Sequence, residues 1–100
     1  MIATADTTER VIETRYSYFN DRCIHIMRWD FDGETYYYAV DSDLTSIGPT
    51  RLCKAMALLD GRRVLGRFRP TCACRSDDDE CHSVAVRRWR RFRAAHPIRP

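Results

Sequence analysis

Four residues that bind zinc well lie close together in the second half of the chain. Cys72 and Cys74 are separated by one residue, and Cys81 and His82 follow as an adjacent pair. Thiolate and imidazole groups are preferred zinc ligands, and four of them complete a tetrahedral site. The spacing is unusual, because adjacent residues seldom both reach one ion. A structural zinc site, in which Cys53 could replace one ligand, therefore stands beside the alternative of reduced thiols packed at a helix start.

Two further cysteine arrangements could support nucleophilic chemistry. Cys81 lies near the start of an expected C-terminal helix, where the pKa of a thiol is lowered. Cys23 and His25 share one face of an expected strand, as a cysteine–histidine nucleophile pair requires. The sequence assigns no third residue that would orient the histidine. We therefore expect these cysteines to be packing residues and the protein not to be an enzyme.

The segment Asp30–Gly33 resembles the D-x-D-G nucleophile motif of haloacid-dehalogenase-type phosphatases. That resemblance implies a parallel α/β scaffold, a downstream lysine and further carboxylates. A chain of 100 residues whose first half alternates like a meander does not supply that scaffold. Asp32 and Gly33 both tolerate positive φ, so we interpret the segment as a hairpin turn.

The distribution of arginine is typical of a site that binds a polyanion. The chain contains sixteen arginines and one lysine, and its net charge is +3. Residues 1–80 carry eleven basic and fourteen acidic side chains, whereas residues 81–100 carry six arginines and no acid. Such asymmetry indicates a surface that meets nucleic acid or an acidic protein. An ordinary solvated helix, with acids at its start and arginines toward its end, is the third interpretation.

A helix over about 79–95 would divide the C-terminal segment into two sides, because successive residues are separated by about 100°. Trp89 and Phe92 fall on the apolar side, so we expect them to face the core. The candidate binding residues on the remaining surface are Arg87, Arg88, Arg90 and Arg91. A second basic group between residues 51 and 69 is formed by Arg51, Lys54, Arg62, Arg63, Arg67 and Arg69.

The residue pattern predicts three strands over 10–18, 23–29 and 34–41, followed by a helix over about 50–60. Thr50 or a neighbour should cap this helix, and Asp60-Gly61 should end it. Its apolar face is formed by Leu52, Met56 and Leu59, with Cys53 and Ala55 alongside. The segment 62–70 is ambiguous between a short strand and a connector.

The predicted fold is a small α+β domain over residues 10–96, between a flexible start (1–9) and a tail (97–100). It consists of an antiparallel three-stranded meander with two helices packed on one face, in the order β-β-β-α-(β)-α. The cysteine knuckle occupies residues 72–82. Sheet followed by helix is also similar to small DNA-binding domains that lay a three-stranded sheet in a groove, although no residue motif of theirs matches.

Three consecutive tyrosines alternate across the third expected strand. Tyr36 and Tyr38 lie on one side, and Tyr37 lies on the other. On an exposed sheet face the pair would form a recognition surface, because tyrosine is enriched at interfaces. Packing beneath the helices is the alternative.

We therefore expect an accessory protein that binds nucleic acid through the C-terminal arginines and the 51–69 segment. The alternative is a phage-type protein that binds and modulates a host machine acting on nucleic acid, such as a nuclease, recombination or CRISPR complex. A zinc-stabilised knuckle is a further alternative, and zinc is the only cofactor we consider. No apolar run approaches the roughly 20 residues that span a bilayer, and no signal-peptide pattern is present, so we expect a cytoplasmic protein.

Overall fold

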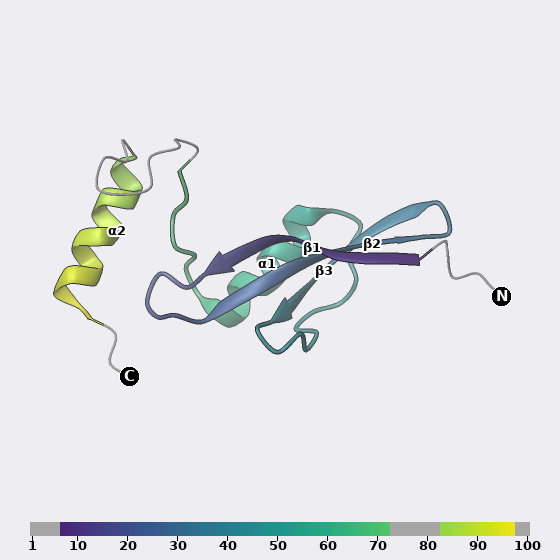
Figure 1. The fold of residues 1–100 in the computed structure, drawn as a ribbon, viewed down its shortest axis with the longest axis horizontal. Coiled ribbons are helices and arrows are strands. Elements are labelled where there is room, and N and C mark those ends of the chain that lie inside the picture. The colour runs from purple at the N-terminus through teal and green to yellow at the C-terminus, as the bar shows by residue number, and fades with distance from the viewer. Residues whose placement is uncertain (1–6, 73–82, 98–100) are drawn as a thin grey trace.

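The computed structural model describes residues 7–72 and 83–97. Three antiparallel strands form one sheet in the order β1-β2-β3, and two helices follow them (Figure 1). The elements are β1 (Thr7–Tyr16), β2 (Cys23–Phe31), β3 (Glu34–Asp41), α1 (Lys54–Leu65) and α2 (Val84–Ala95). The predicted α+β class and the three-stranded meander are confirmed. β1 begins earlier than expected, because Thr7 and Glu9 pair with Phe31 and Trp29.

The turn between β2 and β3 is the predicted hairpin. Asp32 has φ 52° and Gly33 has φ 80°, so both adopt the left-handed conformation that the D-G dipeptide permits. Residues 17–22 connect β1 to β2. In this connection, the Ser17 N–H donates to the Arg22 carbonyl at 2.9 Å. The connection is also tied to the segment after α1, because the Tyr18 N–H donates to the Arg67 carbonyl at 2.7 Å.

The core lies between α1 and one face of the sheet. It is formed by the buried residues Ile24, Ile26, Ala39, Ala57 and Leu65, with Tyr37, Ile47, Leu58 and Phe68 packed around them. Small residues set the distance between helix and sheet. A Cβ on Gly61 would lie 2.8 Å from Cδ1 of Ile24, so only glycine allows this approach without a shift.

The orientation of α1 differs from the sequence expectation. Its buried residues are Ala57, Asp60, Gly61 and Leu65. The predicted apolar face points outward instead: Met56 is 39% exposed and Leu59 is 48% exposed, and Leu52, which precedes the helix, is 77% exposed. The cause is steric, because the close contact with Ile24 requires small side chains on the side that faces the sheet. We call the exposed set Leu52, Met56 and Leu59 the α1 ridge.

The ends of α1 were also predicted incorrectly. Asp60 and Gly61 do not end the helix, which continues to Leu65 before Gly66 at φ 82°. Asp60 is buried, and its carboxylate accepts a hydrogen bond from the Arg51 guanidinium, so this buried polar side chain has a partner. At the other end, Cys53 occupies the N-cap position without a side-chain cap hydrogen bond, in place of the expected Thr50.

The ambiguous segment 62–70 is mostly not a strand. Arg62–Leu65 completes α1, and Phe68 forms a single bridge with Ser17. The chain then reaches the far end of the sheet, where α2 lies beside the β1–β2 connection (Figure 1). Of the two helices that were predicted to pack on one face of the sheet, α1 does so, whereas α2 contacts the β1–β2 connection at the end of the sheet. Among the described residues, no helix is long and apolar enough to span a membrane.

Candidate nucleic-acid interface

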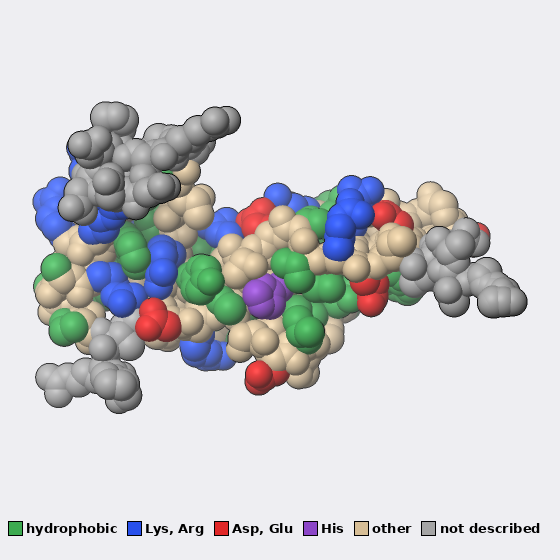
Figure 2. All heavy atoms as spheres, viewed as in Figure 1, with side chains coloured by type: hydrophobic (Ala, Val, Ile, Leu, Met, Phe, Trp, Pro, Cys, Tyr) green, Lys and Arg blue, Asp and Glu red, His purple; other side chains and the backbone are tan. Residues whose placement is uncertain are grey.

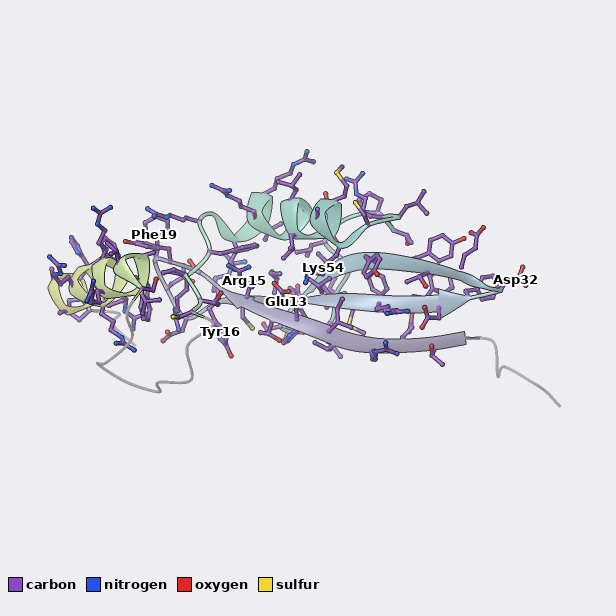
Figure 3. All side chains as sticks on the ribbon, turned by 90° about the horizontal axis from the view of Figure 1, so that it is seen from above. Glu13, Arg15, Tyr16, Phe19, Asp32 and Lys54 are labelled. Carbon is purple, nitrogen blue, oxygen red and sulfur yellow. The ribbon has the colours of Figure 1, made fainter. Side chains whose placement is uncertain are left out.

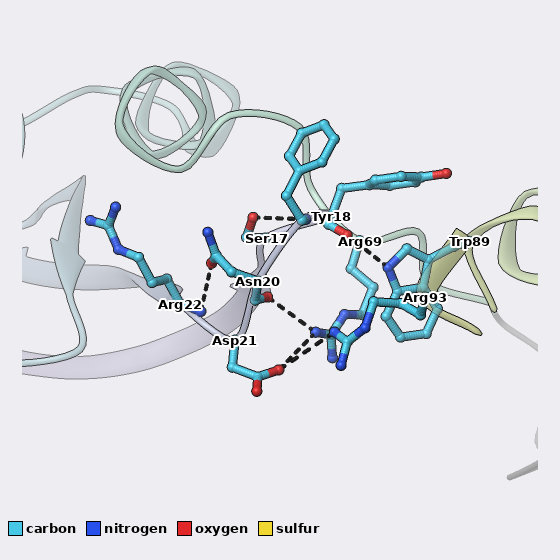
Figure 4. A network of polar contacts seen from close by, with 9 residues as sticks. Ser17, Tyr18, Asn20, Asp21, Arg22, Arg69, Trp89 and Arg93 are labelled. Carbon is cyan, nitrogen blue, oxygen red and sulfur yellow. Dashed lines mark hydrogen bonds and ion pairs between the residues drawn. The ribbon is translucent and has the colours of Figure 1, made fainter. Parts of the chain in front are cut away.

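The aromatic residues of α2 attach the helix to the β1–β2 connection. The indole Nε1–H of Trp89 donates to the Tyr18 carbonyl at 3.1 Å (Figure 4). The ring centroid of Phe92 lies 5.0 Å from that of Tyr18 and 5.9 Å from that of Phe19. Trp89 and Phe92 therefore face the body of the protein, as their helical position predicts, although their neighbours belong to a turn.

Two arginines strengthen this attachment. The guanidinium of Arg69 lies 4.4 Å from the Trp89 ring centroid and 3.6 Å from the Asp21 carboxylate. Arg93 approaches the same carboxylate at 3.5 Å (Figure 4). Cation–π and charge contacts of this kind favour one fixed position of the ring. Arg69 was predicted to be a partner-binding residue. In the structure it helps to hold α2 in place.

The opposite side of α2 presents arginines to solvent. Arg87, Arg88 and Arg91 are exposed, whereas Arg90 is half-buried. None of the ion pairs between described residues includes Arg87, Arg88 or Arg91. We call these three residues the arginine face. They form a positive surface without an internal counter-charge in the described part of the chain.

The start of α2 differs from the predicted start near residue 79. Ser83 is the N-cap, with an extended backbone, and its hydroxyl accepts a hydrogen bond from the Val86 N–H at 3.4 Å. A serine cap of this kind satisfies one of the free N–H groups in the first turn. The acidic run 77–80, which was expected at the start of the helix, where it would complement the helix dipole, lies outside the described residues.

Apart from Arg69, which anchors α2, the basic group between residues 51 and 69 divides into two sets. Arg51 and Lys54 are used internally: Arg51 forms two 2.8 Å hydrogen bonds with Asp60, and Lys54 lies 2.7 Å from Glu13. Figure 3 shows Lys54 and Glu13 close together between α1 and β1.

The second set faces solvent and consists of Arg62, Arg63 and Arg67. Arg62 and Arg63 line a shallow hollow of about 330 Å³ together with Leu59. The guanidinium of Arg67 lies 4.4 Å from the ring centroid of Tyr18, the residue that accepts the Trp89 hydrogen bond. Arg67 is therefore the residue of this set that shares a neighbour with α2.

The internal ion pairs have the electrostatics of structural contacts. The hydrogen bonds from Arg51 lower the pKa of the Asp60 carboxyl below its ordinary value, against the raising effect of desolvation. Lys54 is the main cause of the lowered pKa of Glu13. Both carboxyls are thereby kept ionised, which is the state that holds α1 against the sheet.

The zinc prediction is largely outside the described residues, because Cys74, Cys81 and His82 all lie there. Cys72 is half-buried, and Cys53 is exposed at the N-cap of α1. Among the described residues, no group of three potential ligands is close enough to hold a metal ion. A structural zinc site stays a prediction, which metal analysis of purified protein tests.

The other chemical arrangements are occupied by sheet contacts. Nδ1 of His25 lies 2.8 Å from the Thr14 hydroxyl oxygen across the β1–β2 pair. Asp30 accepts a hydrogen bond from the Thr35 hydroxyl at 2.7 Å, which is the main cause of its lowered pKa. Within the described ranges, neither arrangement assembles a nucleophile, a base and an orienting group.

The surface that α2 contacts was not predicted from the sequence. Tyr18 was expected at the end of a strand, and Phe19 and Asp21 lie between two expected strands, yet these residues contact Trp89, Phe92 and both anchoring arginines. Two consecutive aromatic residues beside a turn were the available signal. No protein-family model matches the chain, and neither the curated proteins nor the solved structures contain a significant match.

Proposed function

We propose that this protein is a small accessory protein that binds nucleic acid through the arginine face of α2. The observation that carries the proposal is the combination of three exposed arginines, Arg87, Arg88 and Arg91, with a helix fixed by Trp89. A guanidinium recognises phosphate oxygens in a bidentate manner. Because the helix is already held in place, less conformational entropy is lost on binding than for a flexible basic arm.

Binding of this type positions a protein on nucleic acid without reading its sequence. Phosphate contacts supply affinity that depends on salt, since each neutralised phosphate releases counterions. Additional exposed cations lie in the last turns of α1 and just after it, namely Arg62, Arg63 and Arg67. We include them as secondary contacts, since Arg63 remains 75% exposed although it lies 4.0 Å from Asp60. We omit Arg69, Arg51 and Lys54, because each forms a closer ion pair with an internal carboxylate.

The sheet itself is a poor surface for a phosphate backbone. Glu9 and Glu34 lie on the face turned away from α1, and they accept hydrogen bonds from Tyr38 and Tyr36 on that face. Arg10 and Arg28 alternate onto the other face, where both approach Asp30. This arrangement argues against the groove-filling sheet of the small DNA-binding domains considered above.

The test is a titration of a short fluorescent DNA duplex, measured by anisotropy at several salt concentrations. We expect the affinity to fall steeply with salt, with a log–log slope of about −0.9 for each phosphate neutralised. Arg87→Glu and Arg91→Glu should each weaken binding by about tenfold or more, because they replace attraction with repulsion. Absence of binding at low salt would rule out the proposal.

A matched control separates the arginine face from net charge. Arg10→Glu changes the net charge by the same amount as Arg91→Glu, but Arg10 lies near the start of β1, whereas α2 contacts the connection that follows the end of β1. We expect its effect on duplex affinity to be much smaller than that of Arg91→Glu. Equal effects of the two substitutions would show that overall charge, rather than the arginine face, governs binding.

The second candidate function is modulation of a protein machine that acts on nucleic acid. It is favoured by the α1 ridge, because exposed apolar side chains lie beside Arg62 and Arg63. Such a surface would bind a partner that combines acidic side chains with apolar ones. Here the test is co-purification from a nuclease-treated lysate. Retention of one stoichiometric protein that is lost in a Leu59→Glu variant supports this function, and loss of all partners on nuclease treatment contradicts it.

A further inference from the structure

The face of the sheet turned away from α1 is rich in aromatic residues. Strand alternation and register bring them together: Trp29 lies opposite Tyr36, and Met27 lies between Val11 and Tyr38. Figure 2 shows hydrophobic side chains spread over the sheet on this side. We call this set the aromatic face, and its members are Val11, Tyr16, Met27, Trp29, Phe31, Tyr36 and Tyr38.

No described helix covers the aromatic face, since α1 packs on the opposite face and α2 contacts the β1–β2 connection. Val11 is 47% exposed, and Tyr16 and Phe31 are each 44% exposed. The Trp29 ring lies 5.2 Å from that of Phe31 and 5.4 Å from that of Tyr36, so the rings form a continuous surface. Contiguous apolar patches of this kind usually mark a binding site.

The charges beside Tyr36 and Tyr38, toward the β2–β3 hairpin, are acidic, whereas at the other end of the aromatic face the guanidinium of Arg69 lies 5.1 Å from the Tyr16 ring centroid. The Tyr38 hydroxyl donates to Glu9 at 2.9 Å, and the Tyr36 hydroxyl donates to Glu34. Burial and the bond to Glu9 raise the pKa of Tyr38 to about 12, so this hydroxyl stays protonated and remains a donor to Glu9. A ligand for this face must therefore combine an apolar surface with positive charge.

We propose that the aromatic face binds a basic amphipathic helix of a partner protein. A helix is the element that packs most readily on a sheet face, and it would complete the second layer as α1 completes the first. Its apolar stripe contacts Trp29, Phe31 and Val11, while flanking arginine or lysine side chains reach Glu9 and Glu34. Cationic side chains also bind favourably over tryptophan and tyrosine rings.

This inference is independent of nucleic-acid binding, because the arginine face and the aromatic face share no residue. It also differs from the second candidate function, which concerns an acidic partner at the α1 ridge.

The experiment uses two labelled synthetic peptides with the full-length protein. Both carry leucines at helical spacing; one has arginines at the flanking positions and the other has glutamates. We expect the basic peptide to bind, as measured by fluorescence anisotropy, and the acidic peptide not to bind, although the protein's net charge is +3. Preference for the acidic peptide, or equal binding of both, overturns the proposal.

Substitutions locate the binding site. Phe31→Lys and Val11→Lys place a cation on the aromatic face at exposed positions, and each should weaken the basic peptide by about tenfold or more. Leu44→Lys is the matched control, because Leu44 is also an exposed apolar residue but lies in the loop after β3. If the control weakens binding as much as Phe31→Lys, the aromatic face is not the site.

Two further measurements distinguish this proposal from nucleic-acid binding and from self-association. Phe31→Lys should leave duplex affinity unchanged, and Arg91→Glu should leave peptide affinity unchanged or raised, so either function can fail alone. Light scattering of the unliganded protein gives the oligomeric state. A dimer that Phe31→Lys converts to a monomer would show that a second copy covers the face, which overturns the assignment to a different partner.

Discussion

α1 and α2 are both 12 residues long, yet different kinds of side chain attach them to the rest of the protein. Along most of its length α1 turns small and charged residues inward, namely Ala57, Asp60 and Gly61, with Leu65 buried at its C-terminal end, and the α1 ridge stays outside. α2 turns Trp89 and Phe92 inward and leaves arginines outside. The amphipathic pattern therefore predicted the orientation of α2, where the contact accommodates large apolar side chains. It did not predict the orientation of α1, where the contact is closer.

The difference follows from the surfaces that the two helices meet. α1 lies against the sheet face that carries Ile24 and Ile26, and its backbone comes so close at Gly61 that a Cβ there would lie 2.8 Å from Cδ1 of Ile24. α2 meets a turn in which the rings of Tyr18 and Phe19 lie edge to face at 5.2 Å and both contact the ring of Phe92. An aromatic surface of this kind accommodates large aromatic residues, and the Trp89 N–H finds an acceptor in the Tyr18 carbonyl.

The largest expected effect is on the attachment of α1. Asp60→Ala removes the buried partner of Arg51, and it should lower the free energy of unfolding by about 2–3 kcal/mol. This is below the range for a fully buried pair, because Arg51 remains 25% exposed. Urea denaturation measures the change. Asp43→Ala, in an exposed loop, is the control, and an equal effect there would contradict the assigned role of Asp60.

The attachment of α2 should be weaker and local. Trp89→Ala should cost about 2 kcal/mol, less than for a fully buried tryptophan because the ring is only half-buried. Hydrogen exchange should show faster exchange in α2 while the amides of β2 keep their protection. Uniform loss of protection in both elements would show that α2 does not open as a separate unit.

Acid should weaken the attachment of α1. The pKa of Asp60 is lowered by Arg51, so its stabilisation is complete above the unfolded-state pKa near 4 and is lost as pH falls toward the folded value. Protonation should cost less than deletion, because a neutral carboxyl still fills its site. Asp60→Asn should flatten the pH dependence of stability below about pH 4, as measured by urea denaturation, and an unchanged slope would contradict the assignment.

The smallest effect is expected at the α1 ridge. Leu59→Gln should change the free energy of unfolding by less than about 0.5 kcal/mol, because the side chain is already in contact with water. Leu65→Ala, at the buried end of the same helix, should cost about 2 kcal/mol or more. A large loss from Leu59→Gln would mean that the ridge packs against protein in solution.

Local signals in the sequence predicted the strands, the hairpin and the amphipathic side of α2. Strand alternation and the Asp32-Gly33 dipeptide depend on backbone sterics that act within a few residues, so they can be recognised without tertiary context. The inward position of Trp89 and Phe92 was recognised for the same reason. Because these two residues face inward, helical spacing places the arginine face on the outside.

Contacts between distant residues decided the remainder. The pairing of Asp60 with Arg51 and the close approach of Gly61 to Ile24 turned α1 against its own apolar pattern. The stacking of Arg69 on Trp89 converted a candidate binding residue into an anchor. These outcomes depend on how closely two surfaces approach and which charges they enclose, and neither quantity is encoded in the local residue pattern.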